Sequence, residues 1–127
     1  MNAPFKLKAP TPSEQDLLGE IVALLRLEQT KGRVAWFARC NGGGMRDRTG
    51  RFLRFYQLYL PKATPKSKGM ADLHGMLAGG RYFALEVKRP GETVTPEQMM
   101  FLEAVREGGG IAAVVHGFED AARALGA

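Results

Sequence analysis

The chain of 127 residues is 45% hydrophobic and 24% charged, a balance typical of one globular domain that excludes wholesale disorder and a collagen-like repeat. Its longest strictly apolar stretches, such as Ile111 to Val115, are far shorter than the roughly 20 residues that a membrane span requires. The formal net charge of +5 by itself only hints at a polyanionic partner. A single cysteine, Cys40, and an N-terminus without the pattern of a secretory signal predict a reducing, cytoplasmic environment and no membrane partner.

The predicted elements follow the order of an α/β domain. Three prolines within residues 1–12 predict a flexible leader before a single domain over 13–127. Ser13 is a suitable N-cap, and Thr95-Pro96-Glu97-Gln98 supplies a cap, a proline at the first helical position and a capping Gln. In chain order we expect a helix over 14–30, a strand over 33–40, a glycine-rich turn over 41–44, a strand or hairpin arm over 52–60, strands over 73–77 and 81–88 joined by a Gly-Gly turn, a helix over 95–107, a strand over 111–115 and a short helix over 119–125.

The second half of the chain predicts how the sheet is built. Phe83, Leu85 and Val87 alternate to one face of the strand over 81–88. The wholly apolar strand over 111–115 follows a helix, and the order strand, helix, strand implies a parallel, right-handed crossover. The order α, β, β, β, α, β therefore predicts a mixed central sheet flanked by helices, with a basic insertion after the first strand.

The positive charge is concentrated in one segment. Between Lys31 and Lys68 there are ten basic residues and one acid, Asp47, whereas from Asp72 to the end there are five bases and eight acids. Six aromatic residues lie among those cations, and such a mixture can pair with phosphates while its rings pack or stack. We expect nucleic acid rather than a membrane surface, because no interfacial amphipathic helix accompanies the charge. A solvated basic loop is the alternative interpretation.

Two carboxylates and an ammonium group are expected to meet at one edge of the sheet. Asp72 opens one arm of the predicted hairpin and Glu86-Val87-Lys88 ends the other, so the turn brings them together. Carboxylate oxygens and a backbone carbonyl such as that of Val87 suit Mg²⁺, which can polarise a phosphoryl oxygen and lower the pKa of a bound water. Lys88 can orient that water or offset developing negative charge. A surface acid beside a Glu/Lys pair is the alternative for the pattern alone.

Several other residues allow a functional and a structural interpretation. Glu14 lies on the apolar stripe of the first helix, Glu20 lies on its shoulder, and either could serve a site, although a first-turn acid is also favoured by the helix dipole. Cys40 has no histidine and acid placed for a catalytic triad, and it is interpreted as a packed residue. We interpret His116 as structural and His74 as a bystander or a DNA contact.

The motifs together resemble a known family. The residues that carry the resemblance are Gly69-Met70-Ala71-Asp72, Glu86-Val87-Lys88 on a strand, Thr95-Pro96-Glu97-Gln98 opening a helix, Ser13-Glu14 opening the first helix, and Asn41-Gly42 after the first strand. This pattern resembles the VRR-NUC (virus-type replication-repair nuclease) branch of the PD-(D/E)XK nuclease superfamily, over most of residues 13–118. The resemblance implies an αβββαβ core of the restriction-endonuclease type.

The resemblance also implies roles for individual residues. Asp72 and Glu86 would hold a Mg²⁺ or Mn²⁺ ion, Lys88 would be the catalytic lysine, Gln98 would be the glutamine near the site, and Glu14 would be the first-helix acid at the metal. Glu20 is the rival of Glu14 for that last role.

The basic insertion would then hold DNA. The candidate DNA-binding residues are Arg39, Asn41, Arg46, Arg48, Arg51, Arg54, Lys66 and Lys68. By resemblance, we expect a homodimeric, bacterial or phage-encoded endonuclease that cuts branched DNA such as Holliday junctions. The alternatives are a nucleic-acid-binding module on a nuclease fold, a restriction-type endonuclease with sequence specificity, and an anion-binding or assembly protein.

Overall fold

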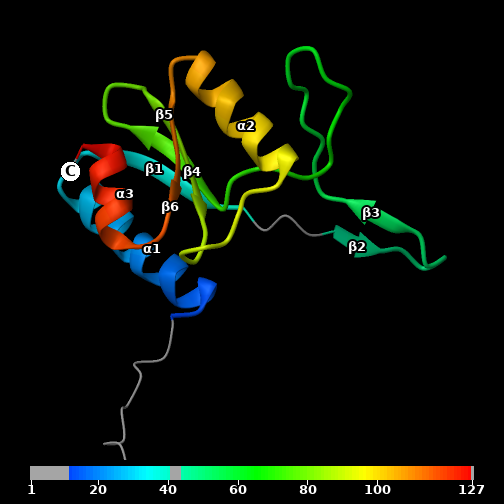
Figure 1. The fold of residues 1–127 in the computed structure, drawn as a ribbon, viewed down its shortest axis with the longest axis horizontal. Helices are drawn as coiled ribbons and strands as arrows, with labels where there is room; N and C mark the ends of the chain where they lie inside the picture. Colours follow the sequence, from blue (N-terminus) through cyan, green and yellow to red (C-terminus); the bar gives the residue numbers. More distant parts are fainter. Residues whose placement is uncertain (1–11, 41–43, 127) are drawn as a thin grey trace, which may run out of the picture.

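A computed structural model describes residues 12–40 and 44–126 of the chain (Figure 1). Residues 1–11 of the predicted leader lie outside these ranges, as do residues 41–43 of the predicted glycine-rich turn. The elements are α1 (Glu14–Thr30), β1 (Val34–Arg39), β2 (Gly44–Arg46), β3 (Phe52–Arg54), β4 (Leu73–Leu77), β5 (Tyr82–Val87), α2 (Pro96–Glu107), β6 (Ile111–Val115) and α3 (Phe118–Leu125). The predicted α/β class is confirmed, and the elements of the core follow the predicted order. Strand β2, which begins at Gly44 within the predicted turn, was not predicted. No helix of the described ranges is long and apolar enough to cross a membrane.

The central sheet has four strands in the order β1-β4-β5-β6. The pairs β1/β4 and β4/β5 are antiparallel, whereas β5 and β6 run parallel. The parallel pair is connected through α2, as the crossover prediction required. Helices α1 and α3 cover one face of this sheet and α2 covers the other (Figure 1).

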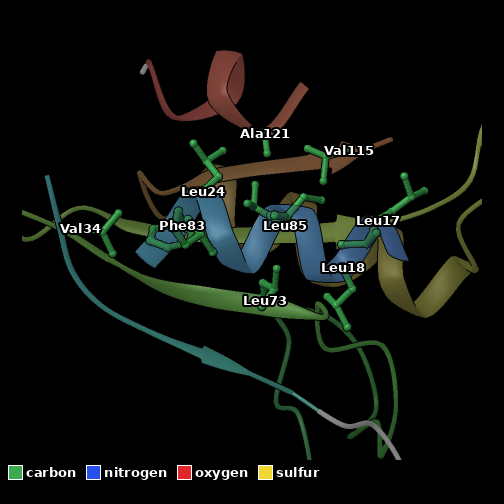
Figure 2. Close-up of a cluster of buried hydrophobic side chains, with 12 residues drawn as sticks. Leu17, Leu18, Leu24, Val34, Leu73, Phe83, Leu85, Val115 and Ala121 are labelled. Carbon is green, nitrogen blue, oxygen red and sulfur yellow. The ribbon is translucent and has the colours of Figure 1, made fainter. Parts of the chain in front are cut away.

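Strand β5 divides the core into two clusters because both of its faces are covered. Phe83, Leu85 and Val87 are fully buried on the face that meets α1 (Figure 2). Ala84 belongs to the second cluster, with Phe101 and Leu102 of α2. The alternation predicted for this strand is confirmed, and burial on both faces places the carboxyl group that β5 carries inside the protein.

The insertion between β1 and β4 contains a shorter element than the strand or hairpin arm predicted over 52–60. Only Phe52–Arg54 is a strand, and it pairs with Gly44–Arg46 in a small antiparallel hairpin. Beyond Arg54 the chain turns back to the domain. Leu58 and Leu60 pack against the cluster under α2, and the Tyr56 hydroxyl accepts a hydrogen bond from the Met70 amide (3.1 Å).

Gly75 in β4 provides a test of how tightly β1 and β4 approach each other. It pairs with Phe37, and a Cβ atom at Gly75 would overlap the Trp36 carbonyl oxygen and lie 2.7 Å from the Phe37 Cα. We expect Gly75→Ala to lower the free energy of unfolding by about 1–3 kcal/mol, as overpacking does elsewhere, measured by urea denaturation. Gly19→Ala is the matched control: a Cβ there meets nothing within 4 Å, so it should stabilise α1 by about 0.5–1 kcal/mol. Equal effects of the two substitutions would contradict the close approach.

Candidate active site

Asp72 is held where three strands come together at one edge of the sheet. It directly precedes β4, and its carbonyl oxygen accepts a hydrogen bond from the Cys40 amide (2.8 Å) just beyond β1. Its side-chain Oδ2 accepts a hydrogen bond from the Val87 amide (2.8 Å) at the end of β5. The hairpin therefore brings together the two strand ends that the sequence motifs marked.

Glu86 lies on β5, one residue before Val87, and only 2% of its surface is exposed. Its Oε1 accepts a hydrogen bond from the Gln98 side-chain amide (3.0 Å). Its Oε2 is buried and has no hydrogen-bond partner among the described residues. A buried carboxylate oxygen without a partner is costly, so this atom calls for a ligand or a proton.

Gln98 connects this carboxyl group to the start of α2. Its amide N–H donates to the Thr95 hydroxyl (3.1 Å) while its side-chain Oε1 accepts from the Thr95 amide (2.9 Å), which completes a capping box. Because Oε1 is used by Thr95, the NH₂ group is the part of the side chain that faces Glu86. The capping role and the contact with the site are both present, as the sequence allowed.

The buried position changes the acidity of Glu86. Burial and the neighbouring Asp72 carboxylate raise the pKa of Glu86 to about 8, and the nearby Lys88 acts in the opposite direction. Burial, with the charges of Asp72 and Glu86, also raises the pKa of the Cys40 thiol above its ordinary value. Without a bound cation, Glu86 therefore retains a proton near neutral pH, and Cys40 remains a thiol.

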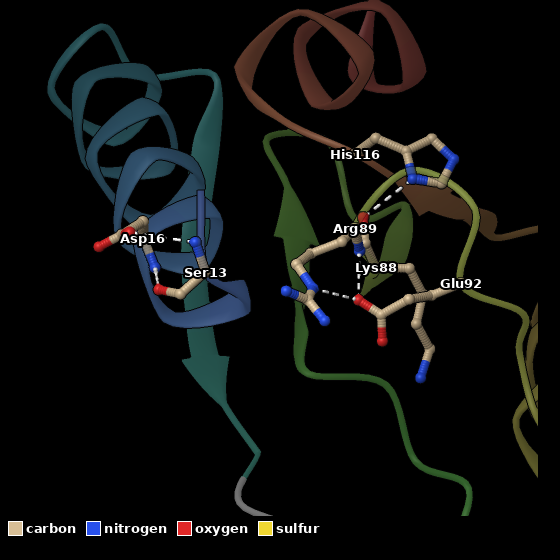
Figure 3. A network of polar contacts seen from close by, with 6 residues as sticks. All are labelled: Ser13, Asp16, Lys88, Arg89, Glu92 and His116. Carbon is tan, nitrogen blue, oxygen red and sulfur yellow. Dashed lines mark hydrogen bonds and ion pairs between the residues drawn. The ribbon is translucent and has the colours of Figure 1, made fainter. Parts of the chain in front are cut away.

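A cavity of about 200 Å³ opens beside Asp72 on the α1 side of the sheet. Its lining residues are Glu14, Gln15, Leu18, Arg39, Cys40, Asp72 and Val87. The capping box of Ser13 and Asp16 fixes the first turn of α1 (Figure 3) and with it the position of Glu14. Glu14 rather than Glu20 faces this cavity, since Glu20 lines separate hollows beside Phe118.

The sequence did not indicate that Cys40 and Gln15 would line the cavity. Cys40 was interpreted as a packed residue, but it lies half-buried at the cavity wall across from Asp72. The β1/β4 register, in which Arg39 pairs with Leu73, produces this placement. Gln15 accepts a hydrogen bond from the Arg39 guanidinium group (3.3 Å) at the same wall.

Lys88 follows β5 directly and is fixed through its backbone. Its amide donates to the Val115 carbonyl (3.0 Å), and its own carbonyl accepts from His116 Nδ1 (2.9 Å). Since a carbonyl oxygen only accepts, Nδ1 carries the hydrogen. Figure 3 shows the imidazole at this carbonyl and the Lys88 side chain extending away from it. His116 thus has a structural contact, with the backbone of Lys88, two residues after the buried Glu86.

His74 lies apart from this cluster. Its Nδ1 is 2.9 Å from the Tyr82 hydroxyl, and its ring meets the edge of Trp36. Burial lowers the pKa of His74. The ring therefore packs as a neutral group between two aromatic side chains.

The donors at this edge fit a hard divalent cation. Asp72, Glu86 and the carbonyl of Val87 are all oxygen donors, and Oε2 of Glu86 lacks a partner among the described residues. Within residues 12–40 and 44–126, no three His, Cys, Asp or Glu side chains are grouped closely enough to hold a metal ion. Glu14 therefore faces the cavity without completing such a group. Two carboxylates with water and substrate oxygens are what Mg²⁺ commonly takes.

The candidate DNA-binding residues fall at two places. Arg39 lines the cavity itself. The four arginines of the hairpin region and Lys68 are exposed, Lys66 is half-buried, and Asn41 lies outside the described residues. The hairpin stands away from the sheet and its covering helices (Figure 1).

Comparison with known proteins identifies the family. The model of the VRR-NUC domain matches residues 48–119, which is more than half of the chain. Asp72, Glu86, Lys88 and Gln98 lie within the match, whereas Glu14 precedes it. No curated protein and no solved structure matches the chain. The match and the fold together show that this chain belongs to the VRR-NUC domain family, which implies a nuclease of the PD-(D/E)XK type.

Proposed function

We propose that this protein is a divalent-metal-dependent endodeoxyribonuclease that hydrolyses phosphodiester bonds with Asp72, Glu86, Lys88 and Gln98. The observation that carries the proposal is the buried Glu86 carboxyl group beside Asp72, with one oxygen held by Gln98 and the other without a partner among the described residues. Such a group is expensive to bury unless it serves a ligand.

Asp72, Glu86 and the Val87 carbonyl would hold Mg²⁺ or Mn²⁺, with Glu14 at the cavity wall; the ion supplies Lewis-acid polarisation of a phosphoryl oxygen and a lower pKa for water. The Val87 amide holds Asp72 in its orientation, and Gln98 does the same for Glu86. The Lys88 ammonium can stabilise negative charge that develops at the phosphate.

We further propose that the substrate is branched DNA, of which the Holliday junction is an example, and that the active form is a homodimer. Residues 12–40 and 44–126 carry one such pair of carboxylates, and symmetric cutting of two strands requires two sites related by a two-fold axis. The proposal of branched DNA follows from the family resemblance.

The direct test is cleavage of labelled four-way junction, flap and linear duplex DNA in Mg²⁺, Mn²⁺ or EDTA. We expect cleavage in either metal, none in EDTA, and the highest rate on a branched substrate. A single cut position in linear duplex of defined sequence would indicate a restriction-type enzyme instead. Binding without cleavage in every condition would contradict the nuclease proposal and favour a binding module.

The basic insertion is proposed to supply the phosphate contacts. Replacement of Arg46, Arg48, Arg51 and Arg54 by Gln should weaken binding to DNA of any sequence, because each lost phosphate contact lowers the slope of log K against log salt by about one unit. Binding titrations in EDTA at several salt concentrations would measure this slope. Replacement of Arg26 and Arg123, exposed on α1 and α3, is the control and should leave it unchanged. An unchanged slope in the fourfold variant would show that the insertion does not contact DNA.

A further inference from the structure

The hairpin of β2 and β3, residues 44–54 and here called the arm, has two faces of different chemistry. Met45 pairs with Leu53, and Arg46 pairs with Phe52. Directly paired residues of an antiparallel ladder point to the same side, and their neighbours point to the other. Met45 and Leu53 therefore form one apolar face, while Arg46, Phe52 and Arg54 share the opposite face.

The cationic face is packed within itself. The Arg54 guanidinium carbon lies 4.5 Å from the centroid of the Phe52 ring, and that of Arg46 lies 5.8 Å from it. The ring also lies against Gly44, where an added Cβ would come within 2.6 Å of it. Phe52 thus holds two arginines on one side of the arm, since cation–π contact offsets part of their mutual repulsion.

The apolar face of the arm is uncovered. Met45 is 58% exposed and Leu53 is 41% exposed, and Phe55, the next residue but one, is 58% exposed. Two-stranded hairpins are only marginally stable by themselves in water, and exposed apolar side chains on such a hairpin do not bury surface that would stabilise it. Neighbouring exposed apolar side chains mark interaction sites on protein surfaces, so this face is a candidate binding surface.

The positive charge of residues 44–69, which include the arm, favours an anionic partner. Residues 44–69 contain seven lysines and arginines and one acid, whereas the rest of the described chain has nine bases and twelve acids. The one acid, Asp47, accepts hydrogen bonds from the amides of Thr49 (2.8 Å) and Arg51 (3.0 Å) and so closes the turn of the arm. A partner that covers both faces of the arm must therefore offer apolar surface to one face and anionic groups to the other.

The insertion also begins and ends at the candidate site. The Cys40 amide bonds to the Asp72 carbonyl across its base, and Leu58 and Leu60 anchor its returning part under α2. The base of the insertion is thereby fixed at the candidate site, and the arm extends from that base.

We propose that the apolar face of the arm, Met45 and Leu53, binds unpaired nucleobases while Arg46 and Arg54 on the opposite face bind the flanking phosphates. This inference rests on the proposed function for its choice of DNA as the partner. Apolar side chains of this kind act as wedges at base steps. Unpaired bases offer their faces without loss of stacking, whereas a fully paired duplex must first be opened, so the arm favours DNA with unpaired bases.

The test compares two DNAs of equal length in EDTA: a duplex with a central stretch of unpaired bases, and the same duplex fully paired. Met45→Thr with Leu53→Thr removes most of the apolar face and retains residues that suit a strand. We expect its affinity for the DNA with unpaired bases to fall roughly 10- to 100-fold, as for the loss of one or two buried side chains. Its affinity for the paired duplex and its salt dependence should be unchanged.

Leu27→Ser is the matched control, since Leu27 is 48% exposed on α1, and it should not alter the preference between the two DNAs. Thermal unfolding of each variant verifies the fold, and Leu53→Thr alone serves if the double variant is unstable. Equal loss on both DNAs, or no loss, would overturn the inference. So would conversion of a dimer to a monomer in sedimentation with an unchanged preference, because the face would then contact a second copy.

Cleavage by the wild type in Mg²⁺, measured in parallel, separates the two proposals. If the wild type cleaves but the threonine variant keeps its preference, the inference about the arm fails and the proposed function stands. If the preference is lost in the variant but the wild type cleaves nothing, the proposed function fails and the arm remains a reader of unpaired bases.

Discussion

Asp72→Asn is expected to reduce metal-dependent DNA cleavage roughly a thousandfold or more while DNA binding is retained or becomes tighter. Asparagine keeps an oxygen for the Val87 amide, which now bonds Asp72 at 2.8 Å, so the strand ends should stay in place. The charge that would hold the cation is lost, and each 1.4 kcal/mol of lost transition-state stabilisation slows the reaction about tenfold. Removal of a negative charge from the cavity wall also removes repulsion toward phosphate.

Initial rates on a branched substrate in Mg²⁺ or Mn²⁺, with affinities in EDTA, would measure both effects. Glu103→Gln is the control, since Glu103 is an exposed carboxylate on α2 that does not line the cavity beside Asp72. It should cleave like the wild type. Cleavage by Asp72→Asn within a few fold of the wild type would exclude Asp72 as a residue of the catalytic site.

Glu86→Gln should stabilise the metal-free protein at pH 8, although we expect the same substitution to abolish cleavage. The pKa of Glu86 in the folded protein is about 8, above its ordinary value, so the folded state keeps a proton that the unfolded chain loses. The stability that this proton contributes is present below the ordinary pKa and is lost as the pH rises toward 8, at a rate of at most about 1.4 kcal/mol per pH unit. Glutamine does not titrate and escapes this loss.

Chemical denaturation in EDTA at a series of pH values would measure the effect as the difference between wild type and Glu86→Gln. The other titrating groups, such as Asp47 and Asp120, whose hydrogen bonds lower their pKa values, are common to both proteins and cancel. The wild type should fall below the variant as the pH approaches 8, and added Mg²⁺ or Mn²⁺ should stabilise the wild type alone. Parallel curves in EDTA would show that Glu86 titrates as an ordinary surface acid.

The sequence predicted the core well because its elements carry strong periodic signals. The alternation of Phe83, Leu85 and Val87 and the cap at Thr95 each depend on local chemistry, and both are found where expected. The strand or hairpin arm predicted over 52–60 is found as a hairpin arm, but only over Phe52–Arg54, because the extent of a strand depends on its pairing with another segment. Pairing between distant segments leaves little trace in a local pattern.

The sequence motifs predicted where the site residues lie, but not how deeply Glu86 is buried. Asp72 and the Glu86-Val87-Lys88 segment lie at neighbouring strand ends, as the predicted hairpin required. The burial of Glu86 depends on α2, which covers that face of β5. Cys40 was interpreted as a packed residue because the sequence places no histidine and acid for a catalytic triad, and β1 also contains a register shift between Val34 and Trp36. Such an irregularity moves the side chains that follow it to the other face of the strand, and no residue type in the sequence predicts it.

The separation of charge in the molecule has a kinetic consequence. The basic insertion and the acidic remainder of the described chain form a dipole whose positive end is the arm, so the field of a polyanion will rotate the protein arm-first during diffusional encounter. Productive orientation then precedes contact, and the association rate constant should decline steeply as ionic strength rises. The acidic remainder of the described chain is repelled by a polyanion that approaches from that side. The same separation of charge therefore accelerates association and selects the orientation in which the protein binds.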